Sequence, residues 1–169
     1  MDSLSAEKSF RHWHADLSNR DTPFEASIGF TVLGKLKTDV PFLGREALER
    51  HRTSGLGRRL VCLTVDDRSV MLHGAETLYR DGVCVGLVKS AAYGYHIGAS
   101  IAHGYAERPA SLDDRITMPK WISTGTWEIG DRGVRHPATY HARAPYDPKM
   151  ERLEEAPEIG DDFSRARTV

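Results

Sequence analysis

The first residue that offers chemistry is a single carboxylate, Glu7, near the start of the chain. It stands one position away from an apolar stripe whose members recur at intervals of three and four residues: Ala6, Phe10, Trp13 and Leu17. That spacing predicts an amphipathic helix over residues 3–17. A carboxylate at the border of such a stripe is either a solvated helix residue or a group at the mouth of a pocket, where it accepts hydrogen bonds from a polar ring or a cation. The residues alone leave both interpretations open.

Two further groups have side chains suited to binding. Arg58 and Arg59 are adjacent at the start of a predicted strand, and although such arginines are usually solvated, a planar guanidinium there can hold a carboxylate or a ring carbonyl. His12 and His14 flank Trp13. On a helix these two imidazoles point about 200° apart, and the sequence has no third His or Cys at ligand spacing, so we expect no metal site.

The first third of the chain must position these groups. Residues 18–23 are turn formers, and Pro23 disfavours helical geometry at the residue before it. The apolar run from Glu25 to Val32 favours a strand, and residues 33–39 then resemble a hairpin connection. Gly44 to Arg52 is predicted to form a short helix, with a Glu46–Arg50 pair and with Gly55 as its stop.

From residue 58 onward the apolar period changes from helical to two. The predicted strands cover residues 60–65, 77–80, 83–85, 100–105, 126–129 and 134–143. Asp81-Gly82 between two of these strands favours a type I′ hairpin turn, and Gly130-Asp131 and Arg132-Gly133 supply further turn chemistry. Many short strands with glycine turns predict a small antiparallel barrel or sandwich.

Composition excludes several classes of function. Lys and Arg total 23 against 24 Asp and Glu in 169 residues, so no global field favours nucleic acid or an anionic membrane. We expect no membrane span, no signal peptide and, with only two cysteines, no disulfide framework. The amphipathic pattern begins directly after Met1, so we expect the chain to be part of a longer protein. Residues 151–169 hold six acids and three arginines and are predicted to be a disordered acidic tail.

Taken in order, these segments resemble the folate-binding region of the aminomethyltransferase family. Members of that family share a Leu-x-x-Glu segment, a Thr-Pro-x-Glu-Ala segment and a Gly-Arg-Glu-Ala-Leu segment, in this order. The matching residues here are Leu4 to Glu7, Thr22 to Ala26 and Gly44 to Leu48, followed by Arg58 to Val61, Gly74 to Gly82, Ala102 to Tyr105 and Tyr146 to Lys149. Within the family, the runs RHWHADL and VPFLGREAL are most similar to the flavin-dependent sarcosine dehydrogenases.

The resemblance covers about residues 2–150 and implies an α+β fold. Residues 1–55 would be the end of an aminomethyltransferase-type folate-binding domain, and residues 56–150 a small antiparallel β-barrel. It implies tetrahydrofolate as a ligand, FAD bound outside this chain by an N-terminal flavin domain, and the missing N-terminal flavin and folate segments as partners. It also implies a mitochondrial matrix location. We expect the 169 residues alone to be inactive and to self-associate through apolar surface that the missing segments would cover.

Four residues correspond to folate-binding positions of that family. Glu7 matches a carboxylate that contacts the pterin ring, Trp13 matches an aromatic position near the folate, and Arg58 or Arg59 matches a basic position at the cavity. No catalytic residue is expected, because the family's other acid would lie upstream.

Two serines depart from the family pattern. Ser9 replaces the glycine that ends the family's helix, which is costly if that residue needs a positive φ, and Ser27 replaces another glycine. Three alternatives to the sarcosine dehydrogenase interpretation stay open. They are a non-catalytic regulatory relative such as the pyruvate dehydrogenase phosphatase regulatory subunit, a dimethylglycine dehydrogenase or glycine-cleavage aminomethyltransferase, and a barrel without activity.

Overall fold

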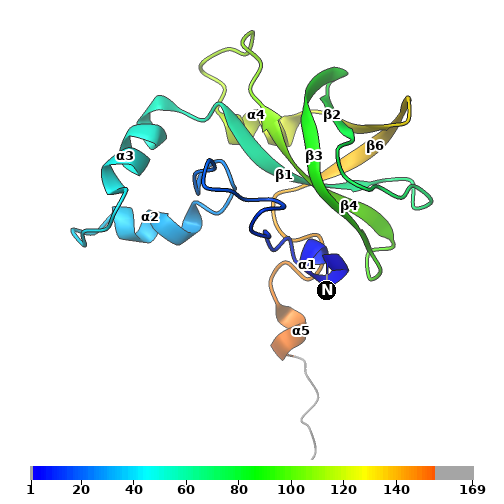
Figure 1. Cartoon of the computed structure of the whole chain (residues 1–169), viewed down its shortest axis with the longest axis horizontal. Helices are drawn as coiled ribbons and strands as arrows, with labels where there is room; N and C mark the ends of the chain where they lie inside the picture. The colour runs from blue at the N-terminus through cyan, green and yellow to red at the C-terminus, as the bar shows by residue number, and fades with distance from the viewer. Residues whose placement is uncertain (1, 155–169) are drawn as a thin grey trace, which may run out of the picture.

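The largest element is a closed antiparallel barrel, seen in the computed structural model, which describes residues 2–154 (Figure 1). Its strands are β1 (Arg58–Val65), β2 (Thr77–Arg80), β3 (Val83–Gly94), β4 (Ala99–Glu107), β5 (Trp127–Asp131) and β6 (Val134–His141). Around the barrel the order is β1-β4-β3-β2-β5-β6, and pairing of β6 with β1 closes it. The prediction of a small antiparallel barrel is confirmed.

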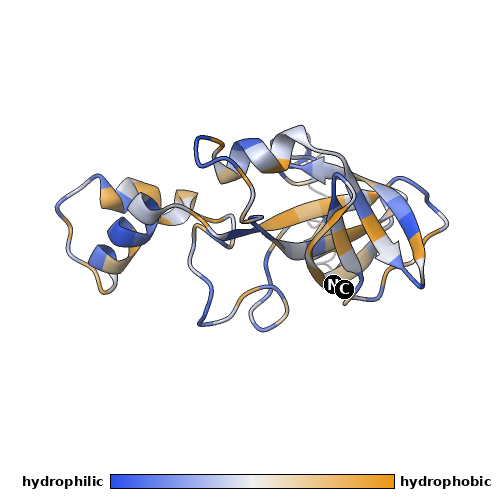
Figure 2. Cartoon of the chain, turned by 90° about the horizontal axis from the view of Figure 1, so that it is seen from above, coloured by the Kyte–Doolittle hydropathy of each residue, from blue (hydrophilic) through white to orange (hydrophobic). Residues whose placement is uncertain are grey.

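The barrel core forms where inward-facing apolar residues alternate with outward-facing ones, as along β2. Figure 2 shows hydrophobic and hydrophilic bands along the strands. Val61, Leu63 and Val65 of β1 all belong to this core. Helix α4 (Met118–Thr124) also contributes to the core, through Met118, Trp121 and Ile122. Trp121 and Trp127 meet edge-on, with ring centroids 6.3 Å apart.

Helix α1 (Asp2–Glu7) packs on the outside of the barrel, against β3 and β4. Ala6 meets Cys62 and Ile101 there in a second, smaller apolar cluster. Strand β1 is therefore buried on both faces over most of its length. This burial raises the pKa of the Cys62 thiol to about 11, so the side chain is an uncharged core residue at neutral pH.

Helices α2 (Phe30–Leu36) and α3 (Arg45–Ser54) extend away from the barrel (Figures 1 and 2). The predicted helix after Gly44 is confirmed. Gly55 caps it with a φ of 82°, and Glu46 lies 3.7 Å from Arg50. None of the helices between residues 2 and 154 is long and apolar enough to cross a membrane.

The predicted helix over residues 3–17 is wrong beyond Glu7. Ser9 has a φ of 53° and His14 a φ of 73°, and such residues cannot continue a right-handed helix. The Asp16 carboxylate also accepts the backbone N–H of His12 at 2.8 Å, which offers the chain a local alternative to helical bonding. The segment after Glu7 is therefore a loop, and its side chains do not follow the helical stripe.

Three other local predictions differ from the structure. Residues 25–32 form no strand and 33–39 no hairpin connection, because helix α2 occupies Phe30–Leu36. A short apolar run suits a strand or a helix equally. Glu25 accepts the backbone N–H of Leu60 in β1 at 2.7 Å, but the N–H groups of Ile28 and Val32 bond locally, to Pro23 and Gly29. Gly130 and Asp131 belong to β5, so the turn is made by Arg132 and Gly133, whose φ values are 45° and 83°.

The hairpin between β2 and β3 is confirmed. Asp81 and Gly82 have φ values of 50° and 77°, the two positive values that a type I′ turn requires. At the other end of the chain, Glu151–Glu154 form the short helix α5. The remainder of the acidic tail predicted to be disordered, residues 155–169, lies outside the described residues.

Candidate functional site

Glu7 is the last residue of α1, and its side chain is buried. Only 1% of the residue is exposed. Oε1 accepts the backbone N–H of His96 at 2.6 Å, and Oε2 lies 2.8 Å from His96 Nδ1. Gly94 leaves room for this approach, because a Cβ there would lie 3.1 Å from Oε1. Glu7 is thus a buried, hydrogen-bonded carboxylate, and the interpretation as a solvated helix residue is wrong.

The segment that follows β6 packs against Glu7 and His96. The backbone N–H of Tyr146 donates to the Glu7 carbonyl at 3.0 Å, and the Tyr146 ring lies 4.7 Å from that of His96. Lys8 Nζ donates to Asp147 Oδ2 at 2.7 Å, and this contact lowers the pKa of the Asp147 carboxyl. Residues 146–147, α1 and the β3–β4 turn are therefore held together.

Next to this corner lies a buried polar cluster that sequence reasoning missed. Ser9 Oγ is 2.9 Å from His103 Nε2, and burial lowers the pKa of His103 to about 4, so the imidazole is neutral at pH 7. The Ser90 hydroxyl donates to Asp16 Oδ1. His103 and Asp16 line a cavity of about 230 Å³. No local signal marks these residues, because Ser9 and His103 are 94 positions apart in the chain.

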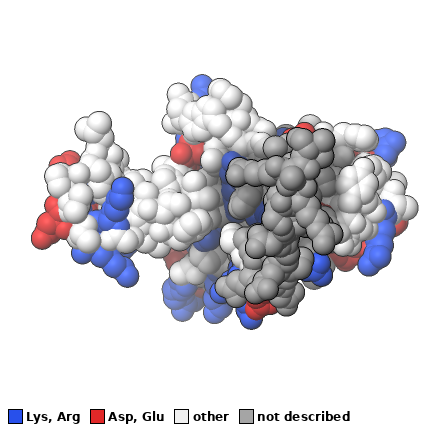
Figure 3. Space-filling view, turned by 90° about the horizontal axis from the view of Figure 1, so that it is seen from below, with Lys and Arg blue, Asp and Glu red and all other residues white. Residues whose placement is uncertain are grey.

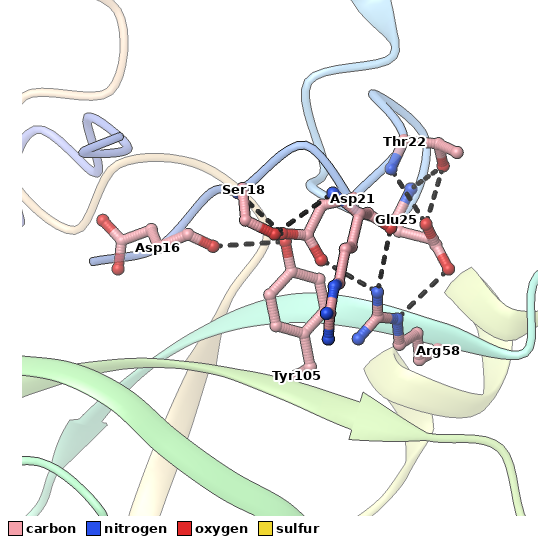
Figure 4. A network of polar contacts seen from close by, with 8 residues as sticks. Asp16, Ser18, Asp21, Thr22, Glu25, Arg58 and Tyr105 are labelled. Carbon is pink, nitrogen blue, oxygen red and sulfur yellow. Dashed lines mark hydrogen bonds and ion pairs between the residues drawn. The ribbon is translucent and has the colours of Figure 1, made fainter. Parts of the chain in front are cut away.

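Arg58 forms ion pairs with two acids of the loop before α2 (Figure 4). Its Nη2 donates to Asp21 Oδ1 at 2.9 Å and its Nε to Glu25 Oε1 at 3.2 Å. Burial alone would raise the pKa of Glu25, but the N–H of Thr22 and the bond from Arg58 lower it. The guanidinium also lies 4.8 Å from the Tyr105 ring centroid. This network attaches the loop to β1 and β4.

The remaining predicted residues differ in environment. Arg59 donates from Nε to Ser27 Oγ at 2.9 Å, and Ser27 in turn donates to the Leu60 carbonyl. Trp13 is 59% exposed and contacts the His14 ring edge-on. Within residues 2–154 no group of three or more His, Cys, Asp or Glu is arranged to hold a metal ion.

The structure does not bring the four predicted residues together. Arg58 pairs with Glu107 at one end of the β1–β4 ladder, whereas Glu7 contacts His96 in the turn beyond the other end, where Gly94 pairs with Ala99. Ala99 and Glu107 are the two ends of β4, so at about 3.3 Å per residue these ends are roughly 26 Å apart along the strand. Glu7 and Arg58 therefore do not contact one small ligand group in common.

A larger cavity of about 560 Å³ lies between the segment from Lys8 to Leu17, residues 27–30 and residues 141–148. Its charged lining residues are Lys8, Arg11 and Arg143. Its volume is typical of a site for a small organic molecule. This cavity lies beside α1, which ends at Glu7, and it has both cationic and apolar walls.

The environment of Glu7 bears directly on its predicted contact with tetrahydrofolate. A carboxylate that binds pterin donors needs accessible oxygens, and Glu7 has both oxygens turned to His96. The pterin contact at Glu7 stays a prediction, and it requires the contact with His96 to open.

Comparisons with known proteins agree with this architecture. The model of the family described as "Glycine cleavage T-protein C-terminal barrel domain" matches residues 58–147. Mouse mitochondrial sarcosine dehydrogenase is 45% identical over 157 residues, which cover 90% of this chain and 16% of that protein. Mouse mitochondrial dimethylglycine dehydrogenase is 38% identical over 114 residues, covering 68% of this chain and 13% of that protein.

The crystal structure of glycine cleavage system aminomethyltransferase T from Bartonella henselae has the same fold. Its TM-score is 0.67 at 21% identity, over 85% of this chain and 37% of that one. The chain thus spans only a small part of the length of the relatives that it matches.

Proposed function

The chain belongs to the family of the glycine cleavage T-protein C-terminal barrel domain, and we propose that it is the tetrahydrofolate-handling C-terminal part of an FAD-dependent sarcosine dehydrogenase. The parent enzyme would demethylate sarcosine oxidatively to glycine and pass the one-carbon unit to tetrahydrofolate. FAD would be bound by a segment outside these 169 residues. By the same argument, the protein would work in the mitochondrial matrix.

The observation that carries this proposal is the extent of the similarity. The 45% identity covers 90% of the chain, so it runs well beyond the barrel at residues 58–147. The likeness to dimethylglycine dehydrogenase is lower and covers less of the chain, which favours sarcosine as the methyl donor.

The proposal also includes the missing segments as partners. Helix α2 and the loop after it carry large apolar side chains on the surface, namely Phe30, Leu33, Val40 and Leu43. Apolar surface of this kind is typical of a face that another domain covers. In the isolated chain it would support self-association.

A second candidate function is a non-catalytic regulatory role, like that named for the pyruvate dehydrogenase phosphatase regulatory subunit. It is favoured by one observation, the closed contact between Glu7 and His96, because a binding carboxylate would be expected to face a cavity.

The experiment is a calorimetric titration of the chain with 5-formyltetrahydrofolate, an oxidation-resistant analogue. The proposal expects saturable binding that is lost in Glu7→Gln and kept in the matched control Glu46→Gln, whose side chain is exposed on α3. Capture of a phosphatase subunit without folate binding would favour the regulatory role instead.

A second measurement tests the parent protein. An antibody raised to residues 58–143 should detect, in source tissue, a band far above the 18.9 kDa of this chain. A single band at that mass would contradict the enzyme proposal.

A further inference from the structure

A single residue, His96, closes off the Glu7 carboxylate. The side chain of Glu7 is 1% exposed, whereas that of His96 is 51% exposed. The backbone N–H of His96 donates to Oε1 at 2.6 Å, and ring Nδ1 lies 2.8 Å from Oε2. Because a carboxylate only accepts hydrogen bonds, Nδ1 carries a proton and donates it to this contact. His96 therefore lies on the solvent side of the contact and shields the carboxylate.

No permanent cation balances Glu7. Within residues 2–154 its only ion-pair partner is His96, and the neighbouring Lys8 is paired with Asp147 at 2.7 Å. A buried carboxylate needs hydrogen-bond donors, and both oxygens of Glu7 receive them from His96. An ionised carboxylate has about four acceptor sites. Further donors can therefore bind to Glu7 once the imidazole has moved away.

The imidazole is held more loosely than the turn that carries it. Ile97, the next residue of the turn, packs against the apolar cluster between α1 and the barrel. The ring of His96 contacts the Tyr146 ring, with centroids 4.7 Å apart, and between residues 2 and 154 its only hydrogen bond is the one to Glu7. Rotation of the His96 side chain therefore uncovers Oε2 while the backbone of the turn stays in place.

The two donors of His96 resemble the edge of a particular class of ring. A ring with an amino group beside a ring N–H presents two neighbouring donors, which suit the two oxygens of a carboxylate. His96 offers one donor to each oxygen of Glu7 in the same way. Because His96 belongs to the same chain, it competes with such a ligand at a high effective concentration.

The charge around the contact favours an uncharged ligand. Lys8 Nζ and Arg152 Cζ lie 5.3 and 5.7 Å from the centroid of the Tyr146 ring, which contacts His96. Figure 3 looks from below at the side of the molecule on which α1 and α5 lie in Figure 1, and Lys and Arg side chains lie on this side. These charges repel a cation such as guanidinium, so the two donors should belong to a neutral ring.

We infer that His96 is an internal competitor of the ligand at Glu7. Its imidazole closes the carboxylate in the free chain and has to swing out before a neutral ring with two adjacent N–H donors binds. The inference rests on the proposed function and deepens it, because it assigns the control of affinity to a residue that does not contact the bound ligand.

The test is a calorimetric titration of the full chain with isocytosine, a neutral ring with an amino group beside a ring N–H. Binding to His96→Ala should be tighter than to wild type by about tenfold or more, because the ligand no longer displaces a charged hydrogen bond. His73→Ala removes an exposed histidine and should bind as wild type does. The gain should vanish in the double variant Glu7→Gln/His96→Ala, since an amide offers only one acceptor oxygen. A merely structural role of His96 would weaken binding instead.

Two further measurements leave His96 in place and do not depend on the folding of His96→Ala. Tyr146→Ala removes the ring that holds the imidazole and should also tighten binding, whereas Tyr146→Phe keeps the ring and should bind as wild type does. In wild type, the Nδ1–H proton of His96 should give an NMR signal that disappears when isocytosine saturates the chain.

Three outcomes overturn the inference. They are no binding of isocytosine to His96→Ala, equal or weaker binding to His96→Ala than to wild type, and an Nδ1–H signal that persists at saturation.

Titration with 5-formyltetrahydrofolate separates this inference from the proposed function. If that compound binds wild type and His96→Ala equally, the folate function stands and the role of His96 fails. If isocytosine binds His96→Ala more tightly than wild type but 5-formyltetrahydrofolate binds neither, the role of His96 stands and the folate function fails.

Discussion

The Glu7 carboxylate and His96, 89 positions apart in the chain, are joined by two contacts. The backbone N–H of His96 lies 2.6 Å from Oε1 and its ring Nδ1 lies 2.8 Å from Oε2. Since Glu7 ends α1 and His96 lies in the β3–β4 turn, this pair attaches the N-terminal helix to the barrel.

Glu7→Gln should lower the free energy of unfolding by about 1.5–3 kcal/mol, because hydrogen bonds to a buried charged group contribute that much. Chemical denaturation measures it. The control Glu46→Gln removes a carboxylate from the exposed surface of α3 and should change stability by no more than about 0.5 kcal/mol. Equal effects of the two substitutions would contradict the role assigned to the Glu7–His96 contact.

Ser9 combines a strained backbone with a buried hydrogen bond. Its φ is 53°, and its hydroxyl lies 2.9 Å from His103 Nε2. Ser9→Gly relieves about 1 kcal/mol of backbone strain but leaves the imidazole unpaired at a cost of about 1–3 kcal/mol, so we expect net destabilisation. Ser9→Ala keeps the strain and should be less stable than Ser9→Gly by about 1 kcal/mol. A glycine variant more stable than wild type would show that strain outweighs the bond.

His103 should make the fold sensitive to mild acid. Its pKa is lowered by burial to about 4 from 6.5, so below pH 6.5 the unfolded chain takes up a proton that the folded chain does not. Stability should therefore fall by about 1.4 kcal/mol per pH unit between those two values and level off below the lower one.

Thermal unfolding of wild type and His103→Gln between pH 4 and 8 measures this contribution, which the substitution should remove. The exposed His73 supplies the control His73→Gln, which should keep the wild-type pH dependence. An unchanged pH dependence in His103→Gln would rule out this source of acid sensitivity.

Arg58→Lys should loosen the loop that precedes α2. A lysine cannot reproduce the fork that reaches Asp21 and Glu25 together, so we expect a loss of about 1 kcal/mol and faster proteolysis within residues 16–25. The pKa values of both acids are lowered in the fold, so the stability that they contribute is present above their unfolded values and is lost as pH falls through the folded ones. The effect of the substitution should therefore shrink below about pH 4. An effect of constant size down to pH 2 would contradict this ion-pair account.

Gly125→Ala should destabilise the end of the barrel that α4 covers. A Cβ at Gly125 would collide with the guanidinium of Arg80, which is buried and donates from Nε to the Trp121 carbonyl at 2.9 Å. We expect a loss of about 1–3 kcal/mol in denaturant unfolding. Gly34→Ala, inside α2 with open space around it, should instead gain up to about 1 kcal/mol. The same sign for both would contradict the steric explanation.

Local chemistry in the sequence was sufficient for most strands and turns of the barrel, but it left a barrel and a sandwich as alternatives. The period-two pattern from residue 58, the Asp81-Gly82 turn and the helix between Gly44 and Gly55 all depend on neighbours within a few positions, and the structure has each of them. The family motifs add the order of these elements. Ser9, which replaces a glycine of the family pattern, does have a positive φ, 53°, whereas the positive φ of 58° at Ser27 was not predicted.

Only the tertiary structure decided what the candidate groups contact. Glu7 meets His96, Ser9 meets His103 and Arg58 meets Asp21, and these pairs are separated by 89, 94 and 37 positions. The helical stripe from Ala6 to Leu17 failed for the same reason, because contacts of Ser9 and Asp16 with β3 and β4 outweigh a weak local helical preference. The sequence by itself predicted the strands and their turns, whose signals are local or periodic, whereas closure of the barrel depends on long-range pairs such as Cys62 with His141. Burial of Glu7 and the cationic cavity depend on how loops pack against the closed sheet, which no short stretch of sequence specifies.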